Sequence, residues 1–283
     1  MVKAFKSPEG RNSVIAGYDS LLSRWPVPYE ELDIPTRCGN THVIACGDTS
    51  APPLVLLHGS ASNSVMWGGD VEEFSKSHRV YAVDIPGEPG KSDETRQDFN
   101  TPAYLDWLVD VFNAMSIKKA SVVGLSLGGW MALKLATAFP DRVEKLVLLC
   151  PSGIGRQKLS FLIYTIPLML MGSRGERRIF KSLFRNVTIA EEAAEYIRLI
   201  NKHFNFINCG IPVYPDEKLK RLTMPVLLIV GGKDTLLDSK ETIKRVKKLI
   251  PHADVKLLRD AGHVLINLAC EISAFLTDRA LLY

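Results

Sequence analysis

The chain has 283 residues, of which 46% are hydrophobic and 23% are charged, a balance that is typical of folded proteins and too apolar for a disordered one. Its 35 basic and 31 acidic side chains leave a formal net charge of +4. This small basic excess is spread along the chain and argues against a dedicated nucleic-acid-binding protein.

The predicted elements begin with a helix over residues 8–24 and two strands over residues 31–37 and 41–46. No helical pattern separates these strands, so we expect an antiparallel pair at the edge of a sheet. From residue 54 onward, short apolar runs alternate with helical patterns. The predicted strands are residues 54–57, 80–84, 120–124, 143–149, 226–230 and 255–258, and the predicted helices are residues 64–75, 102–115, 127–139, 239–250 and 264–282.

Continuous apolar strands separated by helices are typical of a parallel sheet that is buried between two helical layers. The sequence therefore predicts an α/β fold with a mostly parallel sheet of about eight strands and helices on both faces. One interval breaks the alternation, because residues 151–216 contain helical patterns at 159–171, 176–184 and 190–204 but no convincing strand. A structured insertion of this length predicts a helical cap, or lid, over a core formed by residues 1–150 and 217–283.

The segment ASVVGLSLGGW, residues 120–130, carries the strongest chemical signal. A predicted strand runs into Gly124-x-Ser126-x-Gly128 and then into a predicted helix, which is the context of a nucleophile on a sharp strand-to-helix turn. Such a turn leaves room only for small residues two positions before and after the serine, which explains the two glycines. We expect the Ser126 hydroxyl at the C-terminal edge of the sheet, where the Leu127 N–H can face a developing oxyanion.

A serine hydroxyl is a weak nucleophile, so it needs a base and an acid that orients the base. On this kind of scaffold the order along the chain is serine, acid, histidine. His263 lies in the loop after the last predicted strand, at the edge where Ser126 is expected. The other two downstream histidines are less suitable, because His203 falls in the cap and His252 precedes the last strand. We therefore predict that His263 is the base.

The predicted acid is Asp234, which follows the strand at residues 226–230 at the same edge of the sheet. Asp238 is the nearest competitor, but it stands where it can cap the helix at residues 239–250. Asp260 is too close to the predicted base in sequence to be preferred.

A second oxyanion donor is predicted upstream, where the strand at residues 54–57 runs into His58-Gly59-Ser60. A turn at this point can offer a backbone amide, and we assign that of Ser60. Because His58 precedes the nucleophile and lies beside Gly59, we interpret it as a structural turn residue rather than as the base.

These motifs, taken in order, resemble the α/β-hydrolase superfamily over nearly the whole chain. The matching pieces are the His58-Gly59 turn with Trp67, the DIPG turn from Asp84, the GLSLG turn, the GGKD loop and the AGH loop. The sequence is most similar to the carboxylesterase type with a helical cap, and its APPLVLLHG and YAVDIPG segments resemble the carboxylesterase NP subgroup. The turn from Asp84 to Ser92 carries one residue more than the family's Asp-x-Pro-Gly-x-Gly-x-Ser pattern, so its geometry does not follow from the resemblance.

The substrate pocket is less well defined by the sequence. The apolar run at residues 161–171 and Phe204 predict a pocket wall, the packing core of the cap, or both. The candidate pocket residues are Ala61, Phe161, Tyr164, Phe204 and Val264. The cap also carries a basic run, for which a solvated helix face is the main interpretation and attraction of a substrate carboxylate or an acidic partner is the alternative; it comprises Arg174, Arg177, Arg178, Lys181 and Arg185.

The composition also bears on the compartment and the cofactors. The cysteines are odd in number and form no CxxC, so neither a disulfide framework nor a zinc site is expected; they are Cys38, Cys46, Cys150, Cys209 and Cys270. The N-terminus lacks the apolar core of a secretory signal, and the longest apolar run is shorter than the roughly 20 residues that span a bilayer. We expect a cytoplasmic protein, monomeric or homodimeric, without a membrane span, a metal or an organic cofactor.

The sequence thus predicts a serine hydrolase that cleaves a carboxylic ester or related small acyl compound through an acyl-enzyme. Carbon–carbon bond hydrolysis and cofactor-free perhydrolysis use the same three side chains and stay open as alternatives. A ligand-binding receptor or pseudoenzyme on this scaffold is a hypothesis of a different class, since fold alone does not establish activity. Attachment of the cap to a lipid surface is a third hypothesis, against which the mixed charge of the cap argues.

Overall fold

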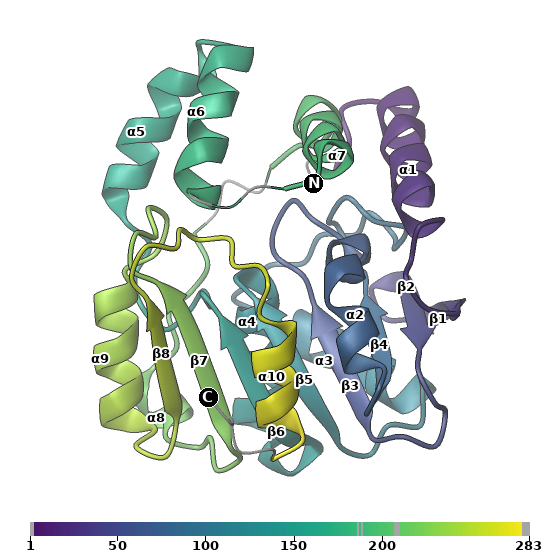
Figure 1. The fold of residues 1–283 in the computed structure, drawn as a ribbon, viewed down its shortest axis with the longest axis vertical. Coiled ribbons are helices and arrows are strands. Elements are labelled where there is room, and N and C mark those ends of the chain that lie inside the picture. The colour runs from purple at the N-terminus through teal and green to yellow at the C-terminus, as the bar shows by residue number, and fades with distance from the viewer. Residues whose placement is uncertain (1–2, 186, 188, 207–209, 279–283) are drawn as a thin grey trace.

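The computed structural model describes residues 3–185, 187, 189–206 and 210–278, which form one eight-stranded sheet between two layers of helices (Figure 1). The spatial order of the strands is β1-β2-β4-β3-β5-β6-β7-β8. Their bounds are β1 Tyr29–Thr36, β2 Gly39–Cys46, β3 Pro53–Leu57, β4 Arg79–Val83, β5 Ala120–Leu125, β6 Val143–Leu149, β7 Val226–Gly231 and β8 Asp254–Leu258.

The sheet is antiparallel only at one edge. β1 pairs antiparallel with β2, and β2 pairs antiparallel with β4, whereas all pairs from β4 to β8 are parallel. The predicted α/β fold with a mostly parallel sheet is therefore confirmed, including the antiparallel pair at its edge. Because parallel strands end at one common edge, the loops that follow β3, β5, β7 and β8 all meet there.

Helices cover both faces of the sheet. In Figure 1, α2 (Val71–Phe74) and α10 (Ala269–Leu276) lie in front of it, and α3 (Ala103–Ala114) and α4 (Leu127–Ala138) lie behind it. The remaining elements are α1 Pro8–Leu22, α8 Asp216–Leu219, α9 Ser239–Leu249 and the short 3₁₀ helices η1 Ser64–Gly69 and η2 Pro140–Arg142.

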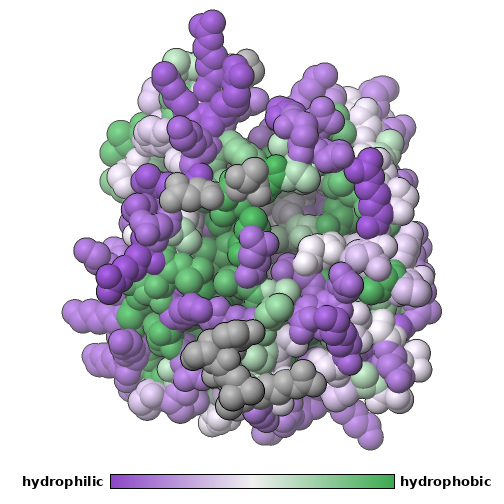
Figure 2. Space-filling view, in the orientation of Figure 1, coloured by the Kyte–Doolittle hydropathy of each residue, from purple (hydrophilic) through white to green (hydrophobic). Residues whose placement is uncertain are grey.

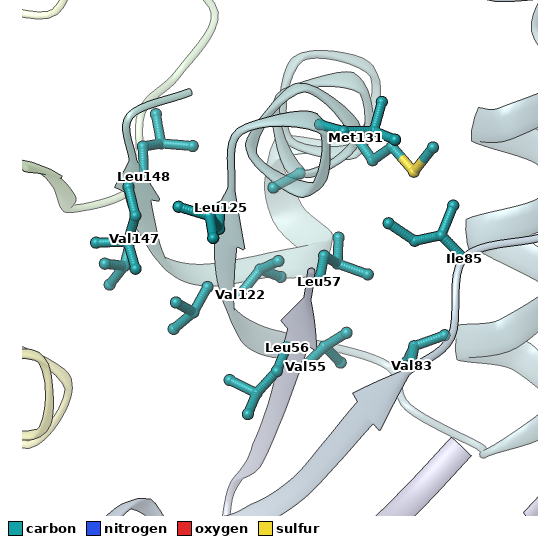
Figure 3. Close-up of a cluster of buried hydrophobic side chains, with 14 of the residues drawn as sticks. Val55, Leu56, Leu57, Val83, Ile85, Val122, Leu125, Met131, Val147 and Leu148 are labelled. Atoms are coloured by element: carbon teal, nitrogen blue, oxygen red, sulfur yellow. The ribbon is translucent and has the colours of Figure 1, made fainter. Parts of the chain in front are cut away.

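The core explains why the strands are apolar on both faces. Figure 3 shows valine and leucine side chains of β3, β5 and β6 gathered with Met131 of α4 and with Ile85. Leu56, in the middle of β3, is completely buried. Burial of one such side chain stabilises a fold by about 1.5–3 kcal/mol, so this cluster holds the central strands in place.

Three of the helices between β6 and β7 in the chain form a separate group: α5 (Leu159–Met169), α6 (Ser173–Phe184) and α7 (Glu191–His203). They lie beyond the edge where the parallel strands end, with α5 beside α6 and with α7 beside α1 (Figure 1). A bridge between Phe5 and Phe204 joins the N-terminal segment to the residue after α7. Among the described residues, no helix has both the length and the apolarity that crossing a bilayer requires.

Two predicted helices differ from the observed ones. The helix predicted at residues 64–75 is divided into η1 and α2, because Gly68 and Gly69 interrupt a helical backbone at an entropic cost. The helix predicted at residues 264–282 begins only at Ala269, since Asn267 has a φ of 59°, a left-handed conformation that no α-helix contains. Residues 279–282 of that prediction lie outside the described residues.

Truncation of Leu56 to alanine tests the role of the core. We expect Leu56→Ala to lower the free energy of unfolding by about 2–5 kcal/mol, because the side chain is completely buried and its truncation leaves a cavity. Urea denaturation measures this loss. The matched control is Leu257→Ala on the edge strand β8, where the side chain is exposed; a loss as large as that of Leu56→Ala would contradict the assignment of the core.

Candidate active site

Ser126 stands at a sharp turn between β5 and α4. Its backbone has φ 51° and ψ −107°, outside the regions that residues with a side chain normally occupy. The Ser126 N–H donates to the carbonyl of Leu149 over 2.9 Å, and the Ser126 carbonyl accepts from Trp130 over 3.0 Å. The first bond secures the turn to the end of β6 and the second starts α4, so the strained conformation is held from both sides.

The two glycines of the Gly-x-Ser-x-Gly motif are required by close backbone contacts. A Cβ on Gly124 would lie 2.5 Å from the carbonyl oxygen of Gly128, and a Cβ on Gly128 would lie 2.1 Å from that of Leu57. Both distances are far below van der Waals contact and both partners are main-chain atoms, which cannot move aside. The motif in the sequence thus reflects how closely α4 approaches β5 and β3.

His263 reaches Ser126 from the loop after β8. Its Nε2 lies 3.0 Å from Oγ of Ser126, and its Nδ1 lies 2.8 Å from Oδ2 of Asp234. With the Nδ1 proton donated to the carboxylate, Nε2 is free to accept from the hydroxyl. All three side chains are buried, and they form one continuous chain of hydrogen bonds.

Asp234 follows β7 and uses its two carboxylate oxygens differently. Oδ1 accepts from the amides of Leu236 and Leu237 over 2.8 and 3.0 Å, while Oδ2 faces His263. Burial alone would raise the pKa of Asp234, but the charge and hydrogen bond of His263 and the two amides outweigh it and hold this pKa below its ordinary value. The group therefore stays ionised. The competitor Asp238 accepts from the Glu241 amide and caps α9.

The amides of Ser60 and Leu127 are the predicted oxyanion donors. Within the described residues neither amide donates a hydrogen bond, and Leu127 is the first residue of α4. Gly59 lies so near the turn at Ser126 that a Cβ on it would be 3.7 Å from Cβ of Ser126. The loop that starts at His58 therefore approaches Ser126 directly.

His58 is a structural residue of this loop. It is completely buried, its Nδ1 lies 2.8 Å from the Gly59 carbonyl, and its Nε2 accepts from the Ile85 amide over 2.9 Å. Burial lowers its pKa, and a neutral ring is what one donated and one accepted bond require. The ring thus fastens the loop after β3 to the turn after β4.

Glu88, which the sequence analysis did not single out, supports the loop of residues 58–63, called the oxyanion loop below because it carries the predicted donor Ser60. The Ala61 amide donates to Oε2 of Glu88 over 2.5 Å, and Ala61 itself has a φ of 54°. Burial raises the pKa of Glu88 to about 7, although the Ala61 amide and the nearby Arg96 favour the charged form. Glu88 lies in the turn that is one residue longer than the family pattern, and that extra length was the available signal.

Two more side chains brace the same loop. Asp84 accepts from the Ser64 amide through Oδ1 over 2.7 Å and from the Lys91 amide through Oδ2 over 2.8 Å. Asn63 donates from Nδ2 to the Pro89 carbonyl over 2.7 Å and to the Tyr196 hydroxyl of α7 over 2.8 Å. The loop after β3 is therefore bonded to the turn after β4 and to α7.

The five candidate pocket residues lie in different parts of the structure. A small cavity of about 40 Å³ adjoins the site and includes Val264 in its wall, together with Met66, Trp67, Asp70, Leu125, Leu149, Leu265, Ile266, Leu268 and Ile272. Ala61 is half-buried in the oxyanion loop. Phe161 and Tyr164 lie on α5 outside this wall, and Phe204 is 1% exposed and packs edge-on against Phe5. Phe204 thus serves the packing of α7 rather than the wall of an open pocket.

Among the described residues, Cys150 joins Asp234 and His263 in a group of side chains of types that can bind a metal. Ligand atoms of Cys150, Asp234 and His263 lie within 4.8 Å of one another. Burial raises the pKa of the Cys150 thiol well above its usual range, and the Asp234 charge adds to this effect. Because metals bind the thiolate, this environment is unfavourable for a metal.

Comparison with known proteins gives consistent matches. Residues 54–271 match the alpha/beta hydrolase family. Two relatives from Bacillus subtilis (strain 168) are the uncharacterized carboxylesterase nap, 32% identical over 88% of this chain and 85% of its own, and carboxylesterase YbfK, 33% identical over 88% and 86%. The crystal structure of naproxen esterase (carboxylesterase NP) from Bacillus subtilis superposes with a TM-score of 0.82 at 31% identity, covering 97% of this chain and 98% of that one.

The buried carboxyl of Glu88 makes stability depend on pH in a defined direction. Since its pKa is about 7 in the fold and 4.5 ordinarily, the native state holds a proton that the unfolded chain has lost between these values. This group therefore lowers stability as the pH rises from about 4.5 to 7. Glu88→Gln removes this titration and keeps an acceptor for the Ala61 amide. As the pH rises from 4.5 to 7, the free energy of unfolding of the variant should therefore increase by up to about 3 kcal/mol relative to that of the wild type.

Urea denaturation of both proteins at pH 5 and pH 8 measures this difference, because every other titrating group cancels in the comparison. If Glu88→Gln and the wild type differed in stability by the same amount at both pH values, the raised pKa of Glu88 would be contradicted.

Proposed function

The chain belongs to the alpha/beta hydrolase family, and from this premise we propose that it is a serine carboxylesterase acting on a small ester or related acyl substrate. The observation that supports this most directly is the unbroken chain of hydrogen bonds from Ser126 through His263 to Asp234, at distances of 3.0 and 2.8 Å. The relatives in Bacillus subtilis, which bear the name carboxylesterase, support an ester as the substrate.

In the proposed reaction, Oγ of Ser126 attacks the ester carbonyl carbon while Nε2 of His263 takes the hydroxyl proton. The carbonyl oxygen gains negative charge and accepts from the amides of Ser60 and Leu127. The tetrahedral intermediate then expels the alcohol, which receives the proton from His263, and an acyl-enzyme is left on Ser126. Water, deprotonated by His263, repeats the attack and releases the carboxylic acid.

Asp234 works through His263. Its ionised Oδ2 accepts the Nδ1 proton, which keeps Nε2 available for the serine and stabilises the imidazolium that forms during each attack. The amides on Oδ1 prevent the carboxylate from rotating away. The preorganised amides of Ser60 and Leu127 act on the transition state directly, and loss of one such donor typically costs about 100- to 1,000-fold in rate.

We also propose that residues 151–216 act as a cap that limits which substrates reach the site. The support for this is that α5, α6 and α7 lie beyond the edge of the sheet at which Ser126 stands, and that Asn63 of the oxyanion loop bonds Tyr196 of α7. Ala61 and Val264 are the candidate pocket residues whose positions fit a contact with substrate.

Removal of the nucleophile is the first test. We expect Ser126→Ala to lower the kcat for a p-nitrophenyl ester by about 10⁴-fold or more, while circular dichroism stays that of the wild type. A fluorophosphonate should label the wild type but not the variant. Ser20→Ala, an exposed serine on α1, is the control and should keep full activity. Retained turnover and labelling in Ser126→Ala would refute the proposal.

Replacement of Asp234 by asparagine tests the role of the acid. An amide NH₂ at this position faces Nδ1 and favours the tautomer in which Nε2 carries the proton, and such a ring cannot accept from Ser126. We therefore expect Asp234→Asn to reduce kcat by about 10⁴-fold with little change in KM, as measured by steady-state kinetics. A loss of less than tenfold would exclude Asp234 as the orienting group.

A further inference from the structure

The hairpin formed by α5 and α6, residues 159–185, presents an unusual row of apolar side chains to solvent. Four large aliphatic residues are 69%, 67%, 60% and 87% exposed; in order they are Leu159, Ile163, Ile166 and Leu170. Their spacing of four, three and four positions places them on one face of α5. Single exposed apolar residues are normal on protein surfaces, but a contiguous row of this kind marks a contact with something else.

The second helix of the hairpin carries a basic face. Its exposed cationic residues recur every three to four positions, and none forms an ion pair with a described residue; they are Arg174, Arg177, Arg178, Lys181 and Arg185. The half-buried Ile179 and Leu183 lie on the opposite side of the helix. With Glu176 as its one acidic residue, the hairpin has a formal charge of +4, equal to that of the whole chain.

The hairpin is therefore one of two strongly basic segments, since residues 239–249 on α9 also carry a formal charge of +4. Figure 1 shows α5 and α6 side by side, projecting from the end of the molecule beyond the strand ends. In Figure 2, hydrophilic side chains cover α6 and hydrophobic ones appear at the outer margin of α5. The turn between the helices begins with Leu170, the most exposed of the large hydrophobic residues, and the first arginine, Arg174, follows in α6.

We propose that this hairpin docks the protein on an anionic lipid surface. The aliphatic row of α5 would enter the boundary between headgroups and acyl chains, and the cations of α6 would pair with lipid phosphates. Each lysine or arginine near an anionic membrane surface strengthens binding about fivefold, so five act strongly together. A second copy of the chain is a poorer partner, because it would bring an identical charge of +4 against the first.

Both ends of the hairpin are joined to the loops of the candidate active site. Lys158, just before α5, donates from Nζ to the Asp234 carbonyl over 2.6 Å. The His263 amide donates to the Leu183 carbonyl of α6 over 2.9 Å. Docking through the hairpin would thus hold the site next to the surface, where apolar esters concentrate. The lipid contact itself does not depend on the proposed esterase activity.

Vesicle co-sedimentation tests the proposal with the full chain and no substrate. The wild type should bind vesicles that contain phosphatidylglycerol, should leave them as salt is raised, and should not bind phosphatidylcholine alone. Two double variants, Ile163→Ser with Leu170→Ser and Arg177→Gln with Arg178→Gln, should each weaken binding at least tenfold. Their side chains are exposed, so thermal unfolding should match the wild type.

The matched control removes the same charge from α9, where Lys247 and Lys248 are also exposed. Lys247→Gln with Lys248→Gln should leave vesicle binding unchanged, and an equal loss would show that net charge alone attracts the lipid. Absence of binding to anionic vesicles would overturn the proposal. So would a dimer in analytical ultracentrifugation that Ile163→Ser with Leu170→Ser dissociates while no vesicle is bound, since the row would then contact a second copy.

Discussion

The turn at Ser126 is the constraint on which the arrangement of the site depends. A residue with a side chain at φ 51° is strained by about 1–3 kcal/mol, and the fold sustains it because β5, β6 and α4 all hold its backbone. The strain points the hydroxyl out of the sheet edge, and it brings α4 so close to β3 that Gly128 has no room for a side chain. The loops after β7 and β8 carry Asp234 and His263 to this fixed hydroxyl.

The oxyanion loop is organised by a different means, a set of buried polar groups that accept its amides. Asp84, Glu88 and His58 each take a backbone N–H from the loop or from the turn opposite, and Asn63 links the loop to α7. These bonds hold in place the loop that carries Ser60, and a donor that is fixed before a reaction needs no reorganisation when charge develops on a substrate. This arrangement lowers the stability of the fold at groups such as Glu88, because burial disfavours its charged form.

Much of the site could be predicted because its parts lie at strand ends. Ser126, Asp234 and His263 each follow an apolar run, and parallel strands bring such positions to one edge whatever the lengths between them. Glu88 could not be placed in this way, since its burial results from the packing of two loops. The same holds for Phe204, the residue after α7, whose partner Phe5 is distant in sequence, and for Asn267, whose local backbone ends the helical pattern early.

The sequence by itself determined the α/β architecture, the sharp turn at Ser126 and the three residues that meet there. Hydrophobic periodicity and glycine spacing are local properties of the chain, which is why these features could be predicted. Tertiary structure alone decided which polar groups support the oxyanion loop and which side of α5 stays exposed. It also decided that the cations of α6 find no acidic partner within the part of the chain that the structure describes. Those properties depend on neighbours that are distant along the chain, and no local pattern encodes the distance between such groups once they have folded.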